Sequence, residues 1–362
     1  MDIQKYIAEK RHNLEKNTDR IRDFRIFDFN YIPDQPLMRQ EIEGVIDSLL
    51  RYQQTGIANN VLILGSRGSG KSLSAKYLIQ EFGKQTDLKF VYVNCRQHNT
   101  SFKIIAHILG IRPRGVSLSE LWQRFEIGNK DKVVFILDEV DLMSDKDKHK
   151  EILYLLSRSE HNFMTILLSN NPKFINSLDE SINSTLQPEI IHFGNYDVFD
   201  IQKILIGRAN IGLKSVPRGI INQIAAMTFG NTNSDVRVAI KTLYLWALEP
   251  NVALKELFEK ARRDILFDVV KDLNDKNLLI LKAAISHQDG YVKDIYQSYR
   301  KISARFNEDP FSYVHYYSNL SYLQSLGLIL LISTKVNRTY TKRVQLTFDQ
   351  SVLSTICQMR FG

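Results

Sequence analysis

The sequence predicts an α/β fold built on a parallel sheet, followed by a helical module and a small C-terminal α+β domain. Short apolar runs alternate with helical stretches up to about residue 193. Residues 199–270 have helical character throughout, and the rest of the chain ends in helices and two strand-like runs. A chain of 362 residues is long enough for two or three domains.

Four apolar runs rich in β-branched residues are the candidate strands, at 61–64, 89–94, 132–137 and 164–169. They are nearly continuous in apolar residues and do not alternate with polar ones. Strands of this kind are buried on both faces, as in a parallel sheet that carries helices on each side.

Composition and charge narrow the class of protein. The formal net charge is +8, and residues 275–362 hold 11 Lys or Arg against 6 Asp or Glu. The C-terminal part therefore suits an anionic partner. Cys95 and Cys357 form no disulfide framework and no metal-ligand pattern. The absence of a signal sequence and of any apolar run near ~18 residues predicts a cytoplasmic protein without membrane partners.

A glycine-rich loop follows the first predicted strand and precedes a helix. The stretch GSRGSGKS (Gly65–Ser72) fits the pattern G-x-x-x-x-G-K-[ST] at every position. Bare backbone N–H groups and a helix N-terminus bind phosphates, with a lysine on the terminal phosphates and a hydroxyl on Mg²⁺. A flexible linker with a solvated lysine is the alternative. We expect the nucleotide to contact Gly68, Ser69, Gly70, Lys71, Ser72 and Leu73.

Polar side chains at the ends of two later strands complete this site. Asp138 can hold the Mg²⁺ shell and Glu139 can orient and deprotonate a water. Asn170, after the fourth run, can position that water. Taken alone, the acidic pair could be a solvated loop and Asn170 part of an Asn-Pro turn. The spacing of about 70 residues from the glycine loop favours the catalytic interpretation.

One arginine of the helical module joins these candidates. Ser234 or Asp235 resembles a helix N-cap, which places Arg237 in the first turn. From there Arg237 could reach phosphate oxygens, although a solvated or cap-paired arginine is the alternative.

These four features, in this order, are typical of an AAA+ ATPase. The stretches 33–43, 153–160 and 168–205 further resemble the archaeal replication initiators related to the eukaryotic origin recognition complex and its helicase-loading partner. The resemblance extends from about Phe27 to Phe361. It implies an AAA+ core over 1–198 with an insert at about 97–128, a helical lid over 199–273, and a winged helix over 274–362.

The resemblance also implies functional residues and ligands. ATP or ADP with Mg²⁺ would lie between core and lid, and Pro33, Arg39 and Tyr196 would line the adenine pocket. The insert would touch DNA through Arg112, Arg114 and Gly115, where an ordinary basic turn is the alternative.

One position departs from the family pattern. The family carries an arginine that reaches a neighbour's ATP, and Ser181 occupies the matching position here. No Lys or Arg occurs between Lys173 and Lys203. Because such an arginine stabilises transition-state charge, we expect hydrolysis to be slow and the nucleotide to act as a switch.

The C-terminal domain has the element order of a winged helix. Helices are expected at 292–305 and 310–327, and strands at 328–334 and 343–349. On the second helix, Val314, His315, Ser318 and Tyr322 are expected on the face toward DNA. The hairpin between the strands is basic, which suits phosphate contact, with a solvated loop as the alternative. Its candidate DNA-binding residues are Lys335, Arg338, Tyr340, Lys342 and Arg343.

The sequence thus predicts an initiator that binds double-stranded origin DNA, associated with the nucleoid. The family implies a sister initiator and a replicative helicase as partners. Two alternatives remain open: a remodelling, transposition or clamp-loading ATPase, and a DNA-bound transcription regulator that keeps a nucleotide.

Overall fold

The computed structural model describes residues 3–4, 18–128, 132–144, 147, 149–287, 290–336, 339–348 and 350–361. The chain divides into two compact units. One unit is Met38–Gly194, and the other joins Met1–Leu37 to Asn195–Gly362. Each unit is described by itself.

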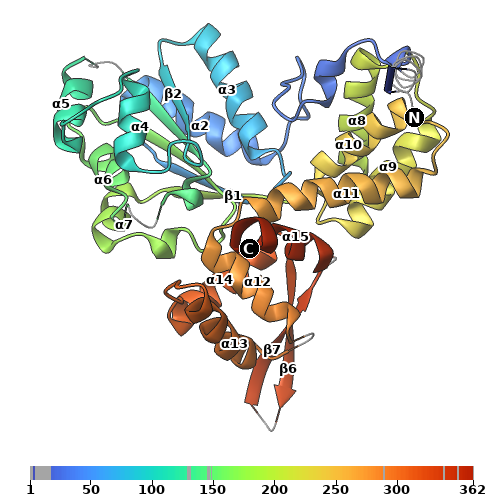
Figure 1. Ribbon diagram of the computed structural model, residues 1–362. Coiled ribbons are helices and arrows are strands. Elements are labelled where there is room, and N and C mark those ends of the chain that lie inside the picture. The colour runs from blue at the N-terminus through green and yellow to red at the C-terminus, as the bar shows by residue number, and fades with distance from the viewer. Residues whose placement is uncertain are drawn as a thin grey trace. The chain divides into compact units, whose positions relative to one another are not determined.

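The first unit is built on a five-stranded parallel sheet (Figure 1). Its strand order is β2-β3-β4-β1-β5, which places β1 between β4 and β5. The prediction of a parallel sheet is confirmed. The strands are β1 (Val61–Gly65), β2 (Lys89–Asn94), β3 (Val133–Asp138), β4 (Met164–Ser169) and β5 (Glu189–Phe193), of which β5 was not among the predicted runs.

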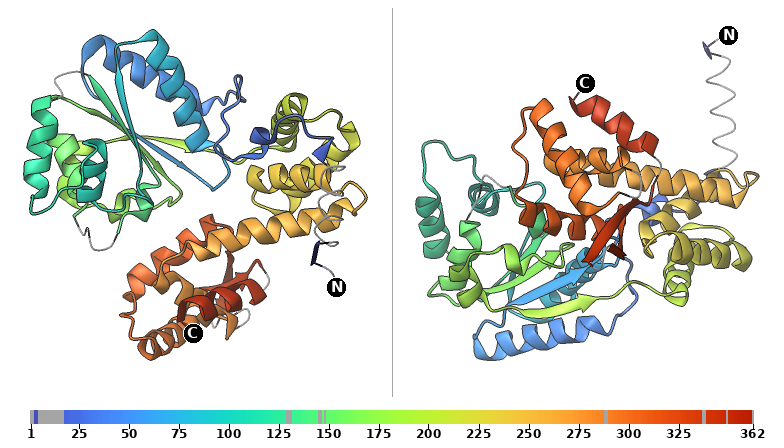
Figure 2. Two further views of the ribbon diagram at one scale, coloured as in Figure 1. Left: turned by 45° about the horizontal axis from the view of Figure 1, so that its top comes forward. Right: turned by 90° about the horizontal axis from the view of Figure 1, so that it is seen from below.

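Helices cover both faces of this sheet. Alternate residues of each strand therefore enter two different hydrophobic cores, one on each face. Leu62 of β1 joins one core, whereas its neighbour Ile63 joins the other. The helices α4 (Ser101–Ile108), α5 (Leu118–Gly128), α6 (Glu151–Arg158) and α7 (Glu180–Leu186) pack on the first face. The helices α2 (Glu41–Thr55) and α3 (Lys71–Gln85) pack on the second, and Figure 2 shows these blue helices across the strands from the green ones.

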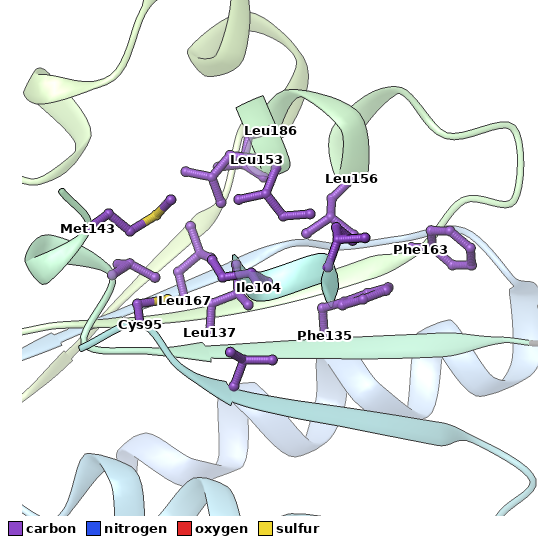
Figure 3. Packing of buried hydrophobic residues seen from close by; sticks show 14 of the residues in the cluster. Cys95, Ile104, Phe135, Leu137, Met143, Leu153, Leu156, Phe163, Leu167 and Leu186 are labelled. Atoms are coloured by element: carbon purple, nitrogen blue, oxygen red, sulfur yellow. The ribbon is translucent and has the colours of Figure 1, made fainter. Parts of the chain in front are cut away.

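The larger core anchors the helical insert. In Figure 3, Phe135 and Leu137 of β3 point toward α6, the helix that carries Leu153 and Leu156. Trp122 and Phe125 of α5 join the same cluster, with ring contacts to Phe135 and Phe163. Because α4 and α5 are tied to the sheet in this way, the loop between them has a fixed base.

The second unit contains a short N-terminal segment and four helices, named the lid helices, against which this segment packs. The segment holds a 3-10 turn, η1 (Phe24–Phe27), and Ile21 pairs with Leu213. Arg208 is 4% exposed and donates to the carbonyls of Ile26, Asp28 and Tyr31. The sequence assigned residues 1–198 to the core, whereas this segment packs on the lid because the Arg208 side chain binds its backbone. The helices are α8 (Val198–Gly212), α9 (Arg218–Asn231), α10 (Val236–Leu248) and α11 (Leu254–Lys271).

The chain ends in a winged-helix domain, as predicted. Its elements are α12 (Asp275–Ile285), α13 (Val292–Arg305), α14 (Tyr313–Ser325), β6 (Ile329–Val336), β7 (Thr339–Leu346) and α15 (Gln350–Phe361). Tyr299 and Tyr316 are fully buried with stacked rings, so they belong to the core. Tyr322 is buried as well, so the prediction that it lies on an open face toward DNA is wrong.

Among the described residues, no helix has both the length and the apolar character needed to cross a membrane.

Candidate functional site

The loop between β1 and α3 has the backbone conformation that a phosphate-binding loop needs. Gly68 and Gly70 adopt positive φ angles of 76° and 90°, which L side chains rarely adopt. The Ser69 hydroxyl donates to the Ser66 carbonyl at 2.9 Å and closes the loop. Gly65 has no room for a side chain, because a Cβ there would lie 2.7 Å from the Phe193 carbonyl oxygen. The glycines are therefore required by the path of the chain.

The Lys71 ammonium lies inside this loop. Nζ donates to the carbonyls of Gly65 and Ser66, each at 2.8 Å, and to Oδ1 of Asn170 at 2.9 Å. Lys71 is only 6% exposed. The structure thus brings the predicted lysine and the predicted Asn170 together: Lys71 begins α3 after the loop that follows β1, Asn170 follows β4, and β1 and β4 are neighbours in the sheet.

Asp138 ends β3 beside the start of α3. It is 3% exposed, and it accepts hydrogen bonds from the Tyr92 hydroxyl at 2.5 Å and from the Ser72 side chain. Burial raises the pKa of Asp138, and the two hydrogen bonds oppose that rise. Mg²⁺ is bound through one or two carboxylates together with substrate phosphates. Asp138 and the Ser72 hydroxyl are adjacent hard oxygen donors that fit such a cation.

Glu139 follows at once with a left-handed backbone, φ 54°. Its Oε2 accepts a hydrogen bond from Nδ2 of Asn94 at 3.1 Å. Asn94 ends β2 and pairs in register with Asp138. The sequence did not single out Asn94, although its place at the end of a strand, like that of Asn170, was a usable signal.

A third carboxylate lies behind the other two. Oδ1 of Asp141 accepts from the Ser169 hydroxyl at 2.9 Å and from the backbone N–H of Asn170 at 3.0 Å, which fixes the end of β4. Burial raises the pKa of Asp141, and its Oδ2 is buried with no hydrogen-bond partner among the described residues. The sequence analysis missed this positioning role.

Arg39 also reaches the loop. Its guanidinium donates to the Ser69 carbonyl at 3.0 Å and to Glu41 at 2.7 Å, and it lies 5.4 Å from the centre of the Phe193 ring. Burial disfavours ionisation of Glu41, but the backbone N–H groups of Glu41 and Gly194, together with Arg39, hold its pKa below the ordinary value. Arg39 is therefore rigidly placed beside the phosphate loop.

The remaining nucleotide candidates belong to the second unit. Pro33 is half-buried and Tyr196 is 6% exposed. Arg237 lies in the first turn of α10, as predicted, and forms an ion pair with Asp235 at 2.5 Å, the residue that caps this helix. The roles of these three residues at a nucleotide stay predictions.

The insert presents its candidate residues at the surface. Arg112, Arg114 and Gly115 are all exposed in the loop between α4 and α5. Gly115 has a φ of 65°, so glycine suits this turn. Ser181 is exposed near the start of α7.

The wing is a longer hairpin than the sequence predicted, because β6 and β7 continue through most of the expected loop. Lys335 pairs in register with Tyr340, and Ser333 with Lys342. Tyr340 is 80% exposed with the Lys335 ammonium over its ring, and the Lys342 ammonium lies over Tyr317 of α14. Arg338 lies outside the described residues.

Residues of one strand alternate between the two faces of a hairpin. Lys335, Tyr340 and Lys342 therefore share the face that meets α14, and Arg343 projects from the opposite face. On α14, His315 is exposed and Ser318 is half-buried.

Known proteins resemble this chain in sequence and in fold. Residues 56–176 match the family described as "AAA domain". The chain is 28% identical to the ORC1-type DNA replication protein of Picrophilus torridus, over 88% of this chain and 85% of that protein. It is 26% identical to ORC1-type DNA replication protein 1 of Sulfurisphaera tokodaii, over 90% and 89%.

Solved structures agree on the fold. The Aeropyrum pernix ORC1 protein, solved in complex with DNA, superposes with a TM-score of 0.66 at 20% identity, covering 94% of this chain and 98% of that one. The Aeropyrum pernix ORC2 protein, in ADPNP–ADP complexes, gives a TM-score of 0.59 at 22% identity, covering 94% and 99%. These likenesses confirm the predicted arrangement of AAA+ core, helical lid and winged helix. The chain thus contains an AAA domain and is similar, over most of its length, to archaeal ORC1-type DNA replication proteins in sequence and to Orc1 and Cdc6 structures in fold.

Proposed function

We propose that this chain is a DNA replication initiator that binds double-stranded origin DNA and holds ATP or ADP with Mg²⁺ as a switch. One observation carries the proposal. The carboxyl edge of one parallel sheet brings together Lys71, Asp138, Glu139 and Asn170, and the C-terminal domain of the same chain carries a basic wing. The names of the relatives and the ligands of the two Aeropyrum proteins support the same function.

At the nucleotide, each residue has a separate task. The N–H groups from Gly68 to Leu73 bind phosphate oxygens, and Lys71 exchanges its loop carbonyls for the terminal phosphates. Ser72 and Asp138 hold the cation, which neutralises phosphate charge. Glu139 accepts a proton from the attacking water, and Asn170 orients that water. In this proposal Arg39, Pro33 and Tyr196 hold the adenine, and Arg237 reaches a phosphate from the lid.

Slow turnover is part of the proposal. The exposed stretch around Ser181 offers no guanidinium to a neighbour's nucleotide, since no Lys or Arg occurs between Lys173 and Lys203. The nucleotide state would then set the position of the lid, assembly with a sister initiator and recruitment of a replicative helicase.

DNA binding in this proposal uses two surfaces. The wing and α14 grip the duplex through Lys335, Tyr340 and Lys342, and the insert loop adds phosphate contacts from Arg112 and Arg114. Gly115 permits a close backbone approach. The protein would act in the cytoplasm, on the nucleoid.

The test is genome-wide footprinting combined with nucleotide turnover. We expect protected sites at replication origins and steady-state hydrolysis well below ~1 s⁻¹. Sites confined to promoters would indicate a transcription regulator instead. Turnover at or above ~1 s⁻¹ that rises on self-assembly would indicate a remodelling motor.

A further inference from the structure

Strand β2 presents two polar side chains toward the acidic end of β3. Tyr92 and Asn94 are two residues apart, so both project from the same face of β2. The Tyr92 hydroxyl donates to Oδ2 of Asp138 at 2.5 Å, and Nδ2 of Asn94 donates to Oε2 of Glu139 at 3.1 Å. One strand therefore holds both carboxylates of the neighbouring strand, each through a separate hydrogen bond.

The hydrogen bond from Tyr92 compensates for the burial of the Asp138 carboxyl group. A buried carboxylate is costly unless it accepts hydrogen bonds, and Asp138 is only 3% exposed. The Lys76 ammonium lies 5.2 Å from the centre of the Tyr92 ring and packs over it.

We propose that Tyr92 is a positioning residue that orients the Asp138 carboxylate for the divalent cation of the bound nucleotide. The inference rests on the proposed nucleotide function. The Tyr92 hydroxyl donates to Oδ2 of Asp138, and the Ser72 side chain hydrogen-bonds to the same carboxyl group, so Tyr92 limits how that group can turn beside the phosphate-binding loop. Groups that orient a metal ligand in this way fix its geometry before the cation arrives.

The experiment compares ATP binding with and without Mg²⁺ in the full-length chain. Tyr92→Phe removes the hydroxyl and keeps the ring. Tyr52→Phe is the matched control, because the Tyr52 hydroxyl is also buried but donates to the carbonyl of Val133, at the opposite end of β3. A fluorescent ATP analogue is titrated in EDTA and then at a series of Mg²⁺ concentrations, and thermal unfolding is followed in parallel.

We expect Tyr92→Phe to raise the Mg²⁺ concentration at half-maximal effect about 10-fold and to leave the affinity in EDTA within about 2-fold, as for other groups that orient metal ligands. Tyr52→Phe should leave the Mg²⁺ dependence unchanged. An Mg²⁺ dependence in Tyr92→Phe equal to that of the wild type would overturn the inference. A purely structural role is also excluded by this split, since it would weaken both affinities together.

Further measurements keep the two proposals separate. Asp138→Asn removes the carboxylate that Tyr92 orients. Adding Tyr92→Phe to it should therefore not change the Mg²⁺ concentration at half-maximal effect any further. A further change of about 10-fold would overturn the inference. If Tyr92→Phe does not fold, Tyr92→Met takes its place, because its flexible side chain fills the space without a hydroxyl. A wild-type chain that binds no nucleotide, or gains nothing from Mg²⁺, would instead refute the proposed nucleotide function.

Discussion

The two faces of the wing should contribute unequally to DNA binding. Lys335 and Lys342 lie on the face that meets α14, whereas Arg343 projects from the other face. We therefore predict that the double substitution Lys335→Ala and Lys342→Ala weakens DNA binding strongly. Arg343→Ala, which also removes a cation from β7, should have little effect.

The magnitude follows from counterion release. Each phosphate contact contributes about 0.9 to the slope of log K against log salt concentration, so losing two contacts lowers the slope by about 1.8. Between 50 and 200 mM salt, the wild type should then lose about 12-fold more affinity than the double variant. Fluorescence anisotropy with a labelled origin duplex, at four or five salt concentrations, measures both slopes.

Two results would refute this reasoning. A double variant with the wild-type slope would mean that the α14 side of the wing makes no phosphate contacts. A larger slope change for Arg343→Ala than for the double variant would mean that the DNA meets the opposite face. Equal thermal unfolding midpoints in the wild type and both variants are the control for folding.

Two other predictions concern the loop and the N-terminal segment. Lys71→Ala should raise the Kd for ATP about 100-fold, because a hydrogen bond to a charged group contributes about 1.5–3 kcal/mol. The affinity for DNA should stay unchanged. Unaltered ATP binding by this variant would rule out the phosphate-loop role. Arg208→Met should lower the free energy of unfolding by about 3 kcal/mol in urea denaturation, because three carbonyls lose a charged donor, whereas the exposed Arg263→Met should change it by less than about 0.5 kcal/mol. An equal effect of the two arginine substitutions would contradict that account.

The sheet illustrates what the sequence could predict about the fold. Strands β1, β3 and β4 were predictable because they lie inside the sheet, are buried on both faces and consist almost wholly of apolar residues. Strand β2 lies at one edge and is only partly buried, but the run 90–93 within it is still apolar or aromatic. Strand β5, at the other edge, was missed because the exposed Glu189 and His192 interrupt its apolar residues.

The candidate site shows the same division. Lys71, Asp138 and Glu139 follow from motifs, in which chemistry requires certain residues at a fixed spacing. Tyr92, Asn94 and Asp141 act through partners on neighbouring strands, and strand register is not legible in one sequence. The helical wheel of α14 placed Tyr322 on the face toward DNA, but Tyr322 is buried. A helical wheel shows the faces of one helix and not which neighbouring elements cover them.

Asp141 allows one further test, which depends on whether the stability of Asp141→Asn relative to wild type rises or falls with pH. Burial raises the pKa of Asp141 in the folded chain. Below the pKa that Asp141 has in the unfolded chain, its carboxyl group is protonated in both the folded and the unfolded state and does not affect the free energy of unfolding. As the pH rises, the unfolded state loses this proton first, which lowers the free energy of unfolding. Asp141→Asn removes that penalty, but its amide N–H₂ at the unpartnered Oδ2 position costs about 1–3 kcal/mol at every pH. The free energy of unfolding of Asp141→Asn, relative to wild type, should therefore rise between pH 4 and pH 7 in urea denaturation. A constant difference would mean that the contacts with Ser169 and Asn170 cancel the effect of burial on the pKa of Asp141, and a difference that falls with pH would mean that they stabilise its anion; either result would contradict the raised pKa.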